Sequence, residues 1–202
     1  MSRELLPTLE TYLNDVKDHK LTILMDNGVY RHMRWGRPDN SDHMVQITTW
    51  PGHLAVTGDM GSFVFSRVHD MFTFFRSPDM KINPGYWSVK IVAEDKHGGV
   101  EKFSVEKFHE AVLCHTRDYL DLEEGAEIPE DIMDEIDPLV ETYDEYDCVE
   151  AMLDFYSDRI KFDDFWEHNL KEYNYCYIWC LYAIVHVISR YDDVSGSNKA
   201  VS

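Results

Sequence analysis

Between residues 21 and 67, short apolar segments alternate with tight-turn sequences, and this alternation restricts the fold more than any other feature of the chain. The turn sequences are Asn27-Gly28, Pro51-Gly52 and Gly58-Asp59-Met60-Gly61. The expected strands between them are residues 21–25, 29–35, 44–50, 53–57 and 62–67. Strands joined by such short turns pair with their neighbours in sequence, so the pattern predicts an antiparallel meander.

Helices are expected before and after this sheet. Residues 3–19 place apolar side chains at three- and four-residue steps, which is typical of a helix that covers a core. A short helix capped by Asp70 follows the fifth strand, and Ser104 caps another helix. A sixth strand is expected at residues 87–93. Further helices are expected at 128–140 and 143–156, with a long helix or helix pair at 162–191.

The predicted fold class is therefore α+β, with an N-terminal helix, an antiparallel sheet of five or six strands and an acidic C-terminal helical region. The expected division places a sheet domain at residues 1–117 and the helical region at 118–191, packed on that domain. Residues 192–202 are polar and are expected to form a disordered tail.

Negative charge is concentrated in one segment of this chain. The formal net charge of the whole chain is −19. Residues 118–164 contain 19 acidic and two basic residues, a net charge of −17, whereas the rest has 19 acidic and 17 basic residues, a net charge of −2. Because like charges repel, this segment is not expected to bind nucleic acid directly or to approach an anionic membrane.

The pattern of these acids favours an interaction surface. Solvated helix faces usually alternate acids with bases, because i,i+4 pairs of opposite charge stabilise a helix, but residues 130–137 contain no base. Apolar stripes within the segment predict that it folds. The expected partner is a basic protein, and the residues expected to contact it are Glu130, Asp131, Asp134, Glu135, Asp137, Glu141, Asp144, Glu145 and Asp147.

Other roles stay open beside this one. The charge can serve solubility alone, whereas a calcium site is disfavoured because residues 118–130 lack the ligand spacing of a calcium loop. A small enzyme using His53, Asp59 and His69 is a second alternative, since His–Asp pairs perform acid–base catalysis. No catalytic residue, metal ligand or cofactor is assigned, because no nucleophile-elbow or metal-ligand spacing is present. The third alternative is a structural or assembly protein that is held in its assembly by the aromatic C-terminal helix.

The sequence also bears on the compartment. The longest apolar run, residues 175–189, is interrupted by His186 and is too short for a membrane span. Acidic residues at Glu4 and Glu10 lie where a signal peptide would be apolar, so a cytoplasmic location is expected. The four cysteines are expected to be reduced and buried, and they are Cys114, Cys148, Cys176 and Cys180.

Residues 50–67 read WPGHLAVTGDMGSFVFSR, and residues 70–75 read DMFTFF. This run resembles a segment found in small, mostly uncharacterised accessory proteins of tailed phages and prophages. Small acidic phage proteins are often inhibitors of host defence, and some mimic DNA. The resemblance therefore implies an anti-defence inhibitor, such as an anti-CRISPR protein, in the host cytoplasm. Its partner would be a nuclease, a CRISPR effector or a restriction enzyme. The resemblance transfers no catalytic residue and does not include the acidic segment.

Overall fold

The structure of the chain, a computed structural model, describes residues 6–96, 98–123 and 125–199. The chain forms two compact units, and the division differs from the expected boundary at residue 117. Unit 1 contains the described residues up to Glu101 and from Tyr173 onward, and unit 2 is Lys102–Glu172. Unit 2 is thus inserted in the sequence of unit 1, and only the last part of the expected acidic region, from Tyr173, belongs to the sheet unit.

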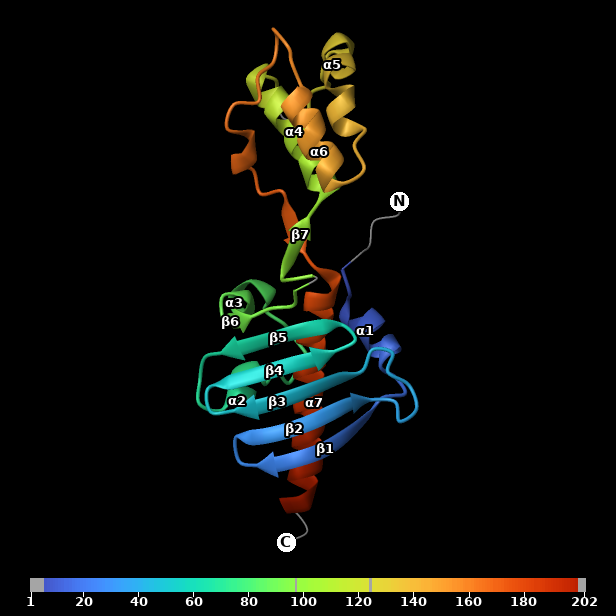
Figure 1. Cartoon of the computed structure of the whole chain (residues 1–202), viewed down its shortest axis with the longest axis vertical. Helices are drawn as coiled ribbons and strands as arrows, with labels where there is room; N and C mark the ends of the chain where they lie inside the picture. Colours follow the sequence, from blue (N-terminus) through green and yellow to red (C-terminus); the bar gives the residue numbers. More distant parts are fainter. Residues whose placement is uncertain (1–5, 97, 124, 200–202) are drawn as a thin grey trace. The chain divides into compact units, whose positions relative to one another are not determined.

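Unit 1 contains the predicted antiparallel sheet (Figure 1). Its strands are β1 (Lys20–Asn27), β2 (Tyr30–Gly36), β3 (Val45–Trp50), β4 (His53–Gly58), β5 (Gly61–Ser66) and β6 (Ile91–Ala93). They lie side by side in sequence order, and every neighbouring pair is antiparallel. The first five are the meander that the alternation of apolar segments and turns predicts.

Gly58 is required by the turn between β4 and β5. Its φ is +156°, and an added Cβ would lie 2.1 Å from the carbonyl oxygen of Met44. No other residue fits this close approach of two backbones, since even alanine would clash with a main-chain atom. The register of β3 against β4 therefore depends on a glycine that the sequence marks as a turn residue.

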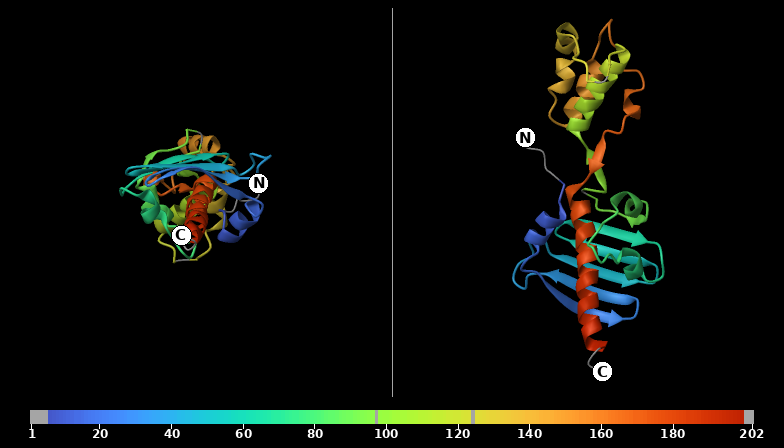
Figure 2. Two further views of the ribbon diagram at one scale, coloured as in Figure 1. Left: turned by 90° about the horizontal axis from the view of Figure 1, so that it is seen from below. Right: turned by 180° about the vertical axis from the view of Figure 1, so that it is seen from behind.

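One face of the sheet is covered by helices, and this face contains the core of unit 1 (Figure 2). The long helix α7 (Tyr175–Lys199) crosses the strands, with α1 (Leu9–Asp15) and α2 (Met71–Phe75) beside it. Buried strand residues alternate along the sequence, as in β5, where Phe63 and Phe65 are buried and their neighbours are not. In α7 residues 177–188 are buried on nearly all sides, which explains its lack of a polar face.

The first helix is shorter than the expected residues 3–19. It begins after Thr8, whose hydroxyl accepts a hydrogen bond from the backbone N–H of Thr11, while the Thr11 side chain reciprocates as a capping box. It ends at Asp15, because the chain then turns into β1. Residues 3–5 of the expected helix lie outside the described residues.

The expected sixth strand at residues 87–93 is correct only in its second half. Trp87 belongs to a helix, α3 (Pro84–Ser88), and β6 begins at Ile91. The side chain of Asn83 caps α3 and Pro84 opens it, a combination that favours a helix start over a strand. Trp87 is 6% exposed and packs in the core of unit 1.

The long helix or helix pair expected at residues 162–191 is instead three elements, of which only the last is a long helix. These are the short 3-10 helix η1 (Phe165–Glu167), strand β8 (Lys171–Tyr173) and helix α7. The break is fixed by Asn174, whose side-chain oxygen accepts a hydrogen bond from the backbone N–H of Cys176 and so caps α7. The helix continues to Lys199 and so includes residues 192–199 of the tail expected to be disordered, and residues 200–202 lie outside the described residues.

Unit 2 is helical and has a core of its own. Its helices are α4 (Val105–Tyr119), α5 (Glu130–Val140) and α6 (Glu145–Asp154), each in contact with the other two. The core contains Phe108, Val112, Ile136, Leu139 and Phe165. Strand β7 (Glu101–Phe103) pairs with β8, which brings together the two chain segments that lead into and out of unit 2.

Candidate functional site

Unit 2 carries almost all of the excess negative charge. Its sequence contains 23 acidic and six basic residues, a net charge of −17, whereas the rest of the chain has 15 acidic and 13 basic residues, a net charge of −2. The structural division therefore coincides with the electrostatic one. A partner attracted by charge would meet unit 2.

Four carboxylates form a stripe along the outer side of α5. The core side of this helix is formed by Ile132, Ile136 and Leu139, all of which are buried. At 100° per residue, the opposite side consists of positions 130, 134, 137 and 141, and all four residues are exposed. These are Glu130, Asp134, Asp137 and Glu141, called the α5 stripe below. Among the described residues, none of the hydrogen bonds or ion pairs involves these four side chains.

Two of the predicted contact residues, Asp131 and Glu135, bind Arg159 within unit 2. Nη1 of Arg159 lies 2.5 Å from Oδ2 of Asp131, and its Nε donates to Oε1 of Glu135 at 2.7 Å. The Ser157 hydroxyl donates to the other Glu135 oxygen at 2.7 Å. These hydrogen bonds lower the pKa of both carboxyls below their usual values. Asp131 and Glu135 therefore fasten the segment after α6 to α5.

The remaining predicted residues lie around α6. Asp144 is its N-cap, since its side chain accepts a hydrogen bond from the backbone N–H of Asp147 at 2.9 Å. Glu145 is exposed in the first turn. Asp147 lines a hollow of about 340 Å³ together with Glu141, Glu150 and Asp154.

The hollow beside α6 is also lined by residues that were not among the predicted partner-binding residues. Glu150 and Asp154 were missed, although the three- and four-residue spacing of positions 147, 150 and 154 places them on one helix face. Tyr143 also lines the hollow and is 81% exposed. Four carboxylates beside an aromatic ring suit a guanidinium or ammonium group, which can pair with acids and stack on the ring.

Exposed tyrosines accompany the acids. Tyr146 and Tyr156 are 71% and 82% exposed, and Leu153 is 74% exposed. The hydroxyl of Tyr146 donates to Glu150 at 3.2 Å, so the ring stands beside the hollow. We refer to the α5 stripe, the hollow and Tyr146 together as the acidic–tyrosine surface. It combines charge with the residue type that most often anchors protein interfaces.

The structure separates the residues of the enzymatic alternative. His53 opens β4 and Asp59 follows its last residue, so six strand steps place them about 20 Å apart. The Nδ1 atom of His53 is 3.1 Å from the carbonyl oxygen of Pro51, and the ring stacks on Trp50. Asp59 accepts a hydrogen bond from the backbone N–H of His43, and the backbone oxygen of His69 accepts one from Gly52. These residues hold turns and do not form a common site.

The assembly alternative relied on aromatic side chains of the last helix. Tyr177 and Trp179 of α7 are fully buried in the core of unit 1. Trp166, which is 51% exposed, is not on that helix but in η1 of unit 2. Helix α7 therefore uses its aromatic residues to support the sheet.

A cysteine and a histidine meet in unit 2, but the thiol is not activated. The Thr142 hydroxyl lies 3.1 Å from the sulfur of Cys148 and 2.9 Å from Nε2 of His109. Burial raises the pKa of the Cys148 thiol and lowers that of His109, which disfavours a thiolate–imidazolium pair. The cluster joins α4 to α6 as a buried polar contact. All four cysteines are free. Cys148 and Cys180 are buried as expected, whereas Cys176 is half-buried and Cys114 is exposed.

Fold and surface together define a class: an α+β protein with an inserted acidic helical unit that presents carboxylates and tyrosines. Comparison with family models, with curated proteins and with solved structures finds no match to this chain. Within the described part of the chain, no helix has the length and apolar character needed to cross a membrane. In the same residues, no group of three or more His, Cys, Asp or Glu side chains is arranged to hold a metal ion.

Proposed function

We propose that this chain is an inhibitory binding protein that docks unit 2 on the basic, nucleic-acid-binding surface of another protein. The observation that carries the proposal is the α5 stripe, in which four exposed carboxylates follow one another without a cation. Acids on a purely solvating face gain stability from neighbouring bases, and these acids do not. A cationic partner supplies the missing countercharge.

The tyrosines support a protein partner for this surface. Tyr143 and Tyr146 expose large apolar rings beside the carboxylates, which solubility alone does not require. At an interface such rings bury area at low entropic cost and accept the cations of Arg and Lys on their faces. The hollow next to them suits one basic side chain as an anchor.

The stripe competes with DNA by charge and does not copy its spacing. Its four acids span eleven residue steps from Glu130 to the C-cap Glu141, which is about one charge per 5.5 Å of helix axis. A DNA strand carries one phosphate per ~3.4 Å of axis, so one stripe is sparser than one strand. The whole of unit 2 is needed to match the charge of a bound duplex. The phage-like run at residues 50–76 makes a host nuclease, CRISPR effector or restriction enzyme the proposed partner class.

The test is capture from a bacterial lysate on the immobilised full chain, with the bound proteins identified by mass spectrometry. We expect nucleic-acid-binding proteins to be retained at about 50 mM salt and released at about 500 mM, because counterions screen both surfaces. Excess duplex DNA should also release them. Asp134→Lys, Asp137→Lys and Glu141→Lys together should reduce retention on the order of 100-fold.

The matched control reverses three exposed acids of unit 1: Glu10→Lys, Asp39→Lys and Asp79→Lys. The net charge changes equally in both variants, so only the position of the charge differs. The control should retain the partner. Equal loss in both variants would show that net charge alone acts, and unchanged capture by the α5 variant would reject the proposal.

A further inference from the structure

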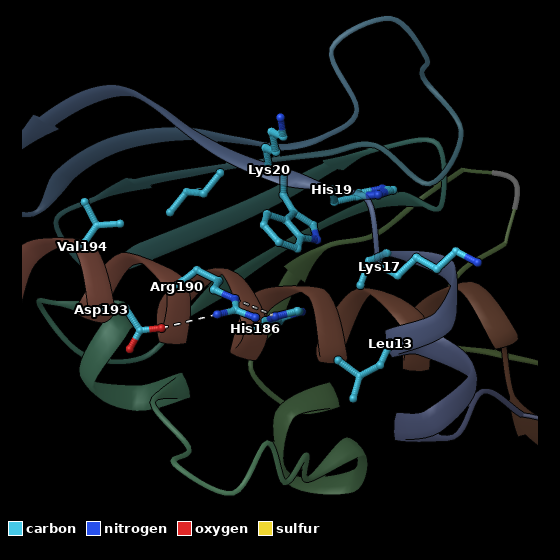
Figure 3. Close-up of a pocket in the computed structure, with 11 residues that line it drawn as sticks. Leu13, Lys17, His19, Lys20, His186, Arg190, Asp193 and Val194 are labelled. Carbon is cyan, nitrogen blue, oxygen red and sulfur yellow. Dashed lines mark hydrogen bonds and ion pairs between the residues drawn. The ribbon is translucent and has the colours of Figure 1, made fainter.

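Unit 1 contains a hollow whose lining differs from the rest of this acidic protein. Its volume is about 500 Å³, and it lies between α1, the start of β1 and α7 (Figure 3). Its walls include the apolar side chains of Leu13, Val16, Leu21 and Trp35. This volume is within the range of small-molecule sites, which are mostly apolar with a few polar groups.

The polar groups of the hollow are mainly cationic. Lys17, Lys20 and Arg190 line it, against a single acid, Asp193. A neighbouring hollow shares Lys17 and Lys20 and adds Arg37, against one further acid, Asp18. In Figure 3 the two lysine side chains extend from the rim, and their flexible stems allow the ammonium groups to turn toward a bound anion. A local excess of cations in a chain of net charge −19 is opposite to the overall balance.

Arg190 is held in a fixed position at the wall of the hollow. Its Nε donates to Nε2 of His186 at 3.2 Å, and its Nη1 lies 3.6 Å from a carboxylate oxygen of Asp193. The other nitrogen of His186 contacts the Tyr12 hydroxyl at 3.2 Å. Burial and Arg190 lower the pKa of His186 to about 4, so the ring is neutral and accepts from the guanidinium. Such preorganisation reduces the entropy lost when a ligand binds.

His19 adds a buried polar atom without a partner. The residue is 7% exposed and lines both hollows. Its Nε2 donates to the carbonyl oxygen of His43 at 3.1 Å, which leaves Nδ1 as the acceptor of a neutral ring. This Nδ1 is buried and makes no hydrogen bond to any residue that the structure describes. Unpaired buried polar atoms are costly, and because this nitrogen accepts, it would be satisfied by a ligand group that donates a hydrogen bond, such as a hydroxyl, and not by an anionic head.

From these observations we infer that the hollow between α1, β1 and α7 binds a small amphipathic anion. The ligand class has a carboxylate or phosphate head, facing Lys17, Lys20 and Arg190, and an apolar body against Leu13, Val16 and Trp35. This site lies in unit 1 and is independent of the acidic–tyrosine surface of unit 2. The inference therefore goes beyond the proposed function and can fail separately from it.

The probe is the aromatic sulfonate 1-anilinonaphthalene-8-sulfonate, whose fluorescence rises in an apolar site, titrated into the full chain at pH 7. We expect one bound probe per chain. Phenylbutyrate and phenyl phosphate should displace it and thereby report which head is preferred. Phenylbutylamine has the same apolar body as phenylbutyrate but a cationic head, and it should not compete. Inorganic phosphate should compete only weakly, because it lacks the apolar body.

Two variants locate the probe in the hollow. Lys17→Gln with Lys20→Gln removes two exposed charges and should weaken binding roughly tenfold. Leu13→Trp fills the hollow without changing charge and should abolish binding. All three positions are exposed, so neither variant threatens folding. Lys81→Gln with Lys90→Gln, also in unit 1, is the matched control and should bind normally.

Each opposite result overturns the inference. Absence of probe binding to the unaltered chain rejects the site. Equal competition by phenylbutylamine rejects the anionic head, and equal competition by inorganic phosphate rejects the apolar body. Unchanged binding by Leu13→Trp places the probe elsewhere on the chain.

Discussion

Arg31 is a charged residue of β2 whose side chain lies on the helix-covered face of the sheet, and it is only 8% exposed. Asp70 neutralises it through two hydrogen bonds, from Nη1 at 2.8 Å and from Nη2 at 3.0 Å. The guanidinium also stacks over the Phe72 ring, 4.4 Å from its centre. Asp70 has a second role as the N-cap of α2, accepting from the backbone N–H of Phe72. One carboxylate therefore holds both a helix start and a buried cation.

Asp70→Asn tests the charge while keeping the cap, because asparagine caps helices as well as aspartate does. Removing Asp70 leaves the buried guanidinium with only the longer ion pair to Asp26, at 4.0 Å from Nε, so the free energy of unfolding should fall by about 3 kcal/mol. The measurement is urea unfolding followed by tryptophan fluorescence, since four of the five tryptophans are in unit 1. Asp192→Asn is the control, because its pair with Arg76 is exposed and should contribute about 1 kcal/mol or less.

The pair of Arg31 and Asp70 also makes the free energy of unfolding depend on pH. The hydrogen bonds from Arg31 lower the pKa of Asp70 below its unfolded value. The stability from this pair is therefore fully present above about pH 4 and is lost as the pH falls through the lower folded pKa. The unaltered chain should lose stability below about pH 4 more steeply than Asp70→Asn does. Parallel pH profiles for the two proteins would contradict this assignment.

Among the elements, α5 carries acids at both ends, and the two ends have opposite effects on its stability. A carboxylate at the N-terminal Glu130 is favoured by the helix dipole, whereas one at Asp137, in the last turn, is disfavoured. Asp137→Lys should therefore stabilise α5 by about 0.5 kcal/mol, and Glu130→Lys should destabilise it by a similar amount. Hydrogen exchange of the α5 amides, read by mass spectrometry, should slow in the first variant and quicken in the second.

Both single variants should nevertheless weaken capture of the basic partner, because each removes one acid from the α5 stripe. Stability and binding would then change in opposite directions for Asp137→Lys. A shift of exchange in the same direction for both variants would show that the dipole does not govern this helix. Retained capture by both would show that the stripe does not touch the partner.

Elements defined by local signals were predictable from the sequence. The first five strands follow from alternating apolar residues and glycine turns. The side chains of Asp70 and Ser104 cap α2 and α4, so the starts of these helices could also be predicted. Strands β7 and β8 have three residues each and exist only through pairing across about 70 positions, so no local pattern reveals them. The break at Asn174 was not predicted, because the long apolar run of α7 begins directly after it.

The candidate surface was predictable to a similar extent. Helical periodicity places Glu130, Asp134 and Asp137 on one face, as the sequence indicates. The partner of Asp131 and Glu135 is Arg159, which lies 28 and 24 positions away, so their internal role required the fold. In unit 1, His186 interrupts an apolar run and could have pointed to the hollow between α1, β1 and α7.

At the scale of the molecule, each unit has a hydrophobic core of its own among the described residues. Every buried residue of the first core lies before Glu101 or after Tyr173, and every buried residue of the second lies between Lys102 and Glu172. Unit 2 enters and leaves through paired strands β7 and β8, and the backbone N–H of Ser104 donates to the carbonyl oxygen of Leu170 at 2.9 Å. Insertions with adjacent ends and a separate core are commonly removable.

Replacing residues 105–169 with Asn-Gly should therefore leave unit 1 folded. The pair between Ser104 and Leu170 then closes on a two-residue turn, for which Asn-Gly is the favoured sequence. The shortened chain should unfold in a single urea transition and bind anilinonaphthalene sulfonate with unchanged affinity. It should retain no basic protein from the lysate, because the acidic–tyrosine surface is gone.

The complementary piece, residues 102–172, should keep the capture activity and lose the probe. Its 71 residues carry a net charge of −17, so self-repulsion opposes a core that is small for its length. Salt should therefore raise its melting temperature by screening these charges, while the same salt weakens capture. Circular dichroism melts at about 50 and 500 mM NaCl measure the change in melting temperature, and lysate capture at the same two salt concentrations measures the loss of binding. Salt-independent melting would mean that repulsion within unit 2 is balanced internally, which would remove the electrostatic argument for a cationic partner.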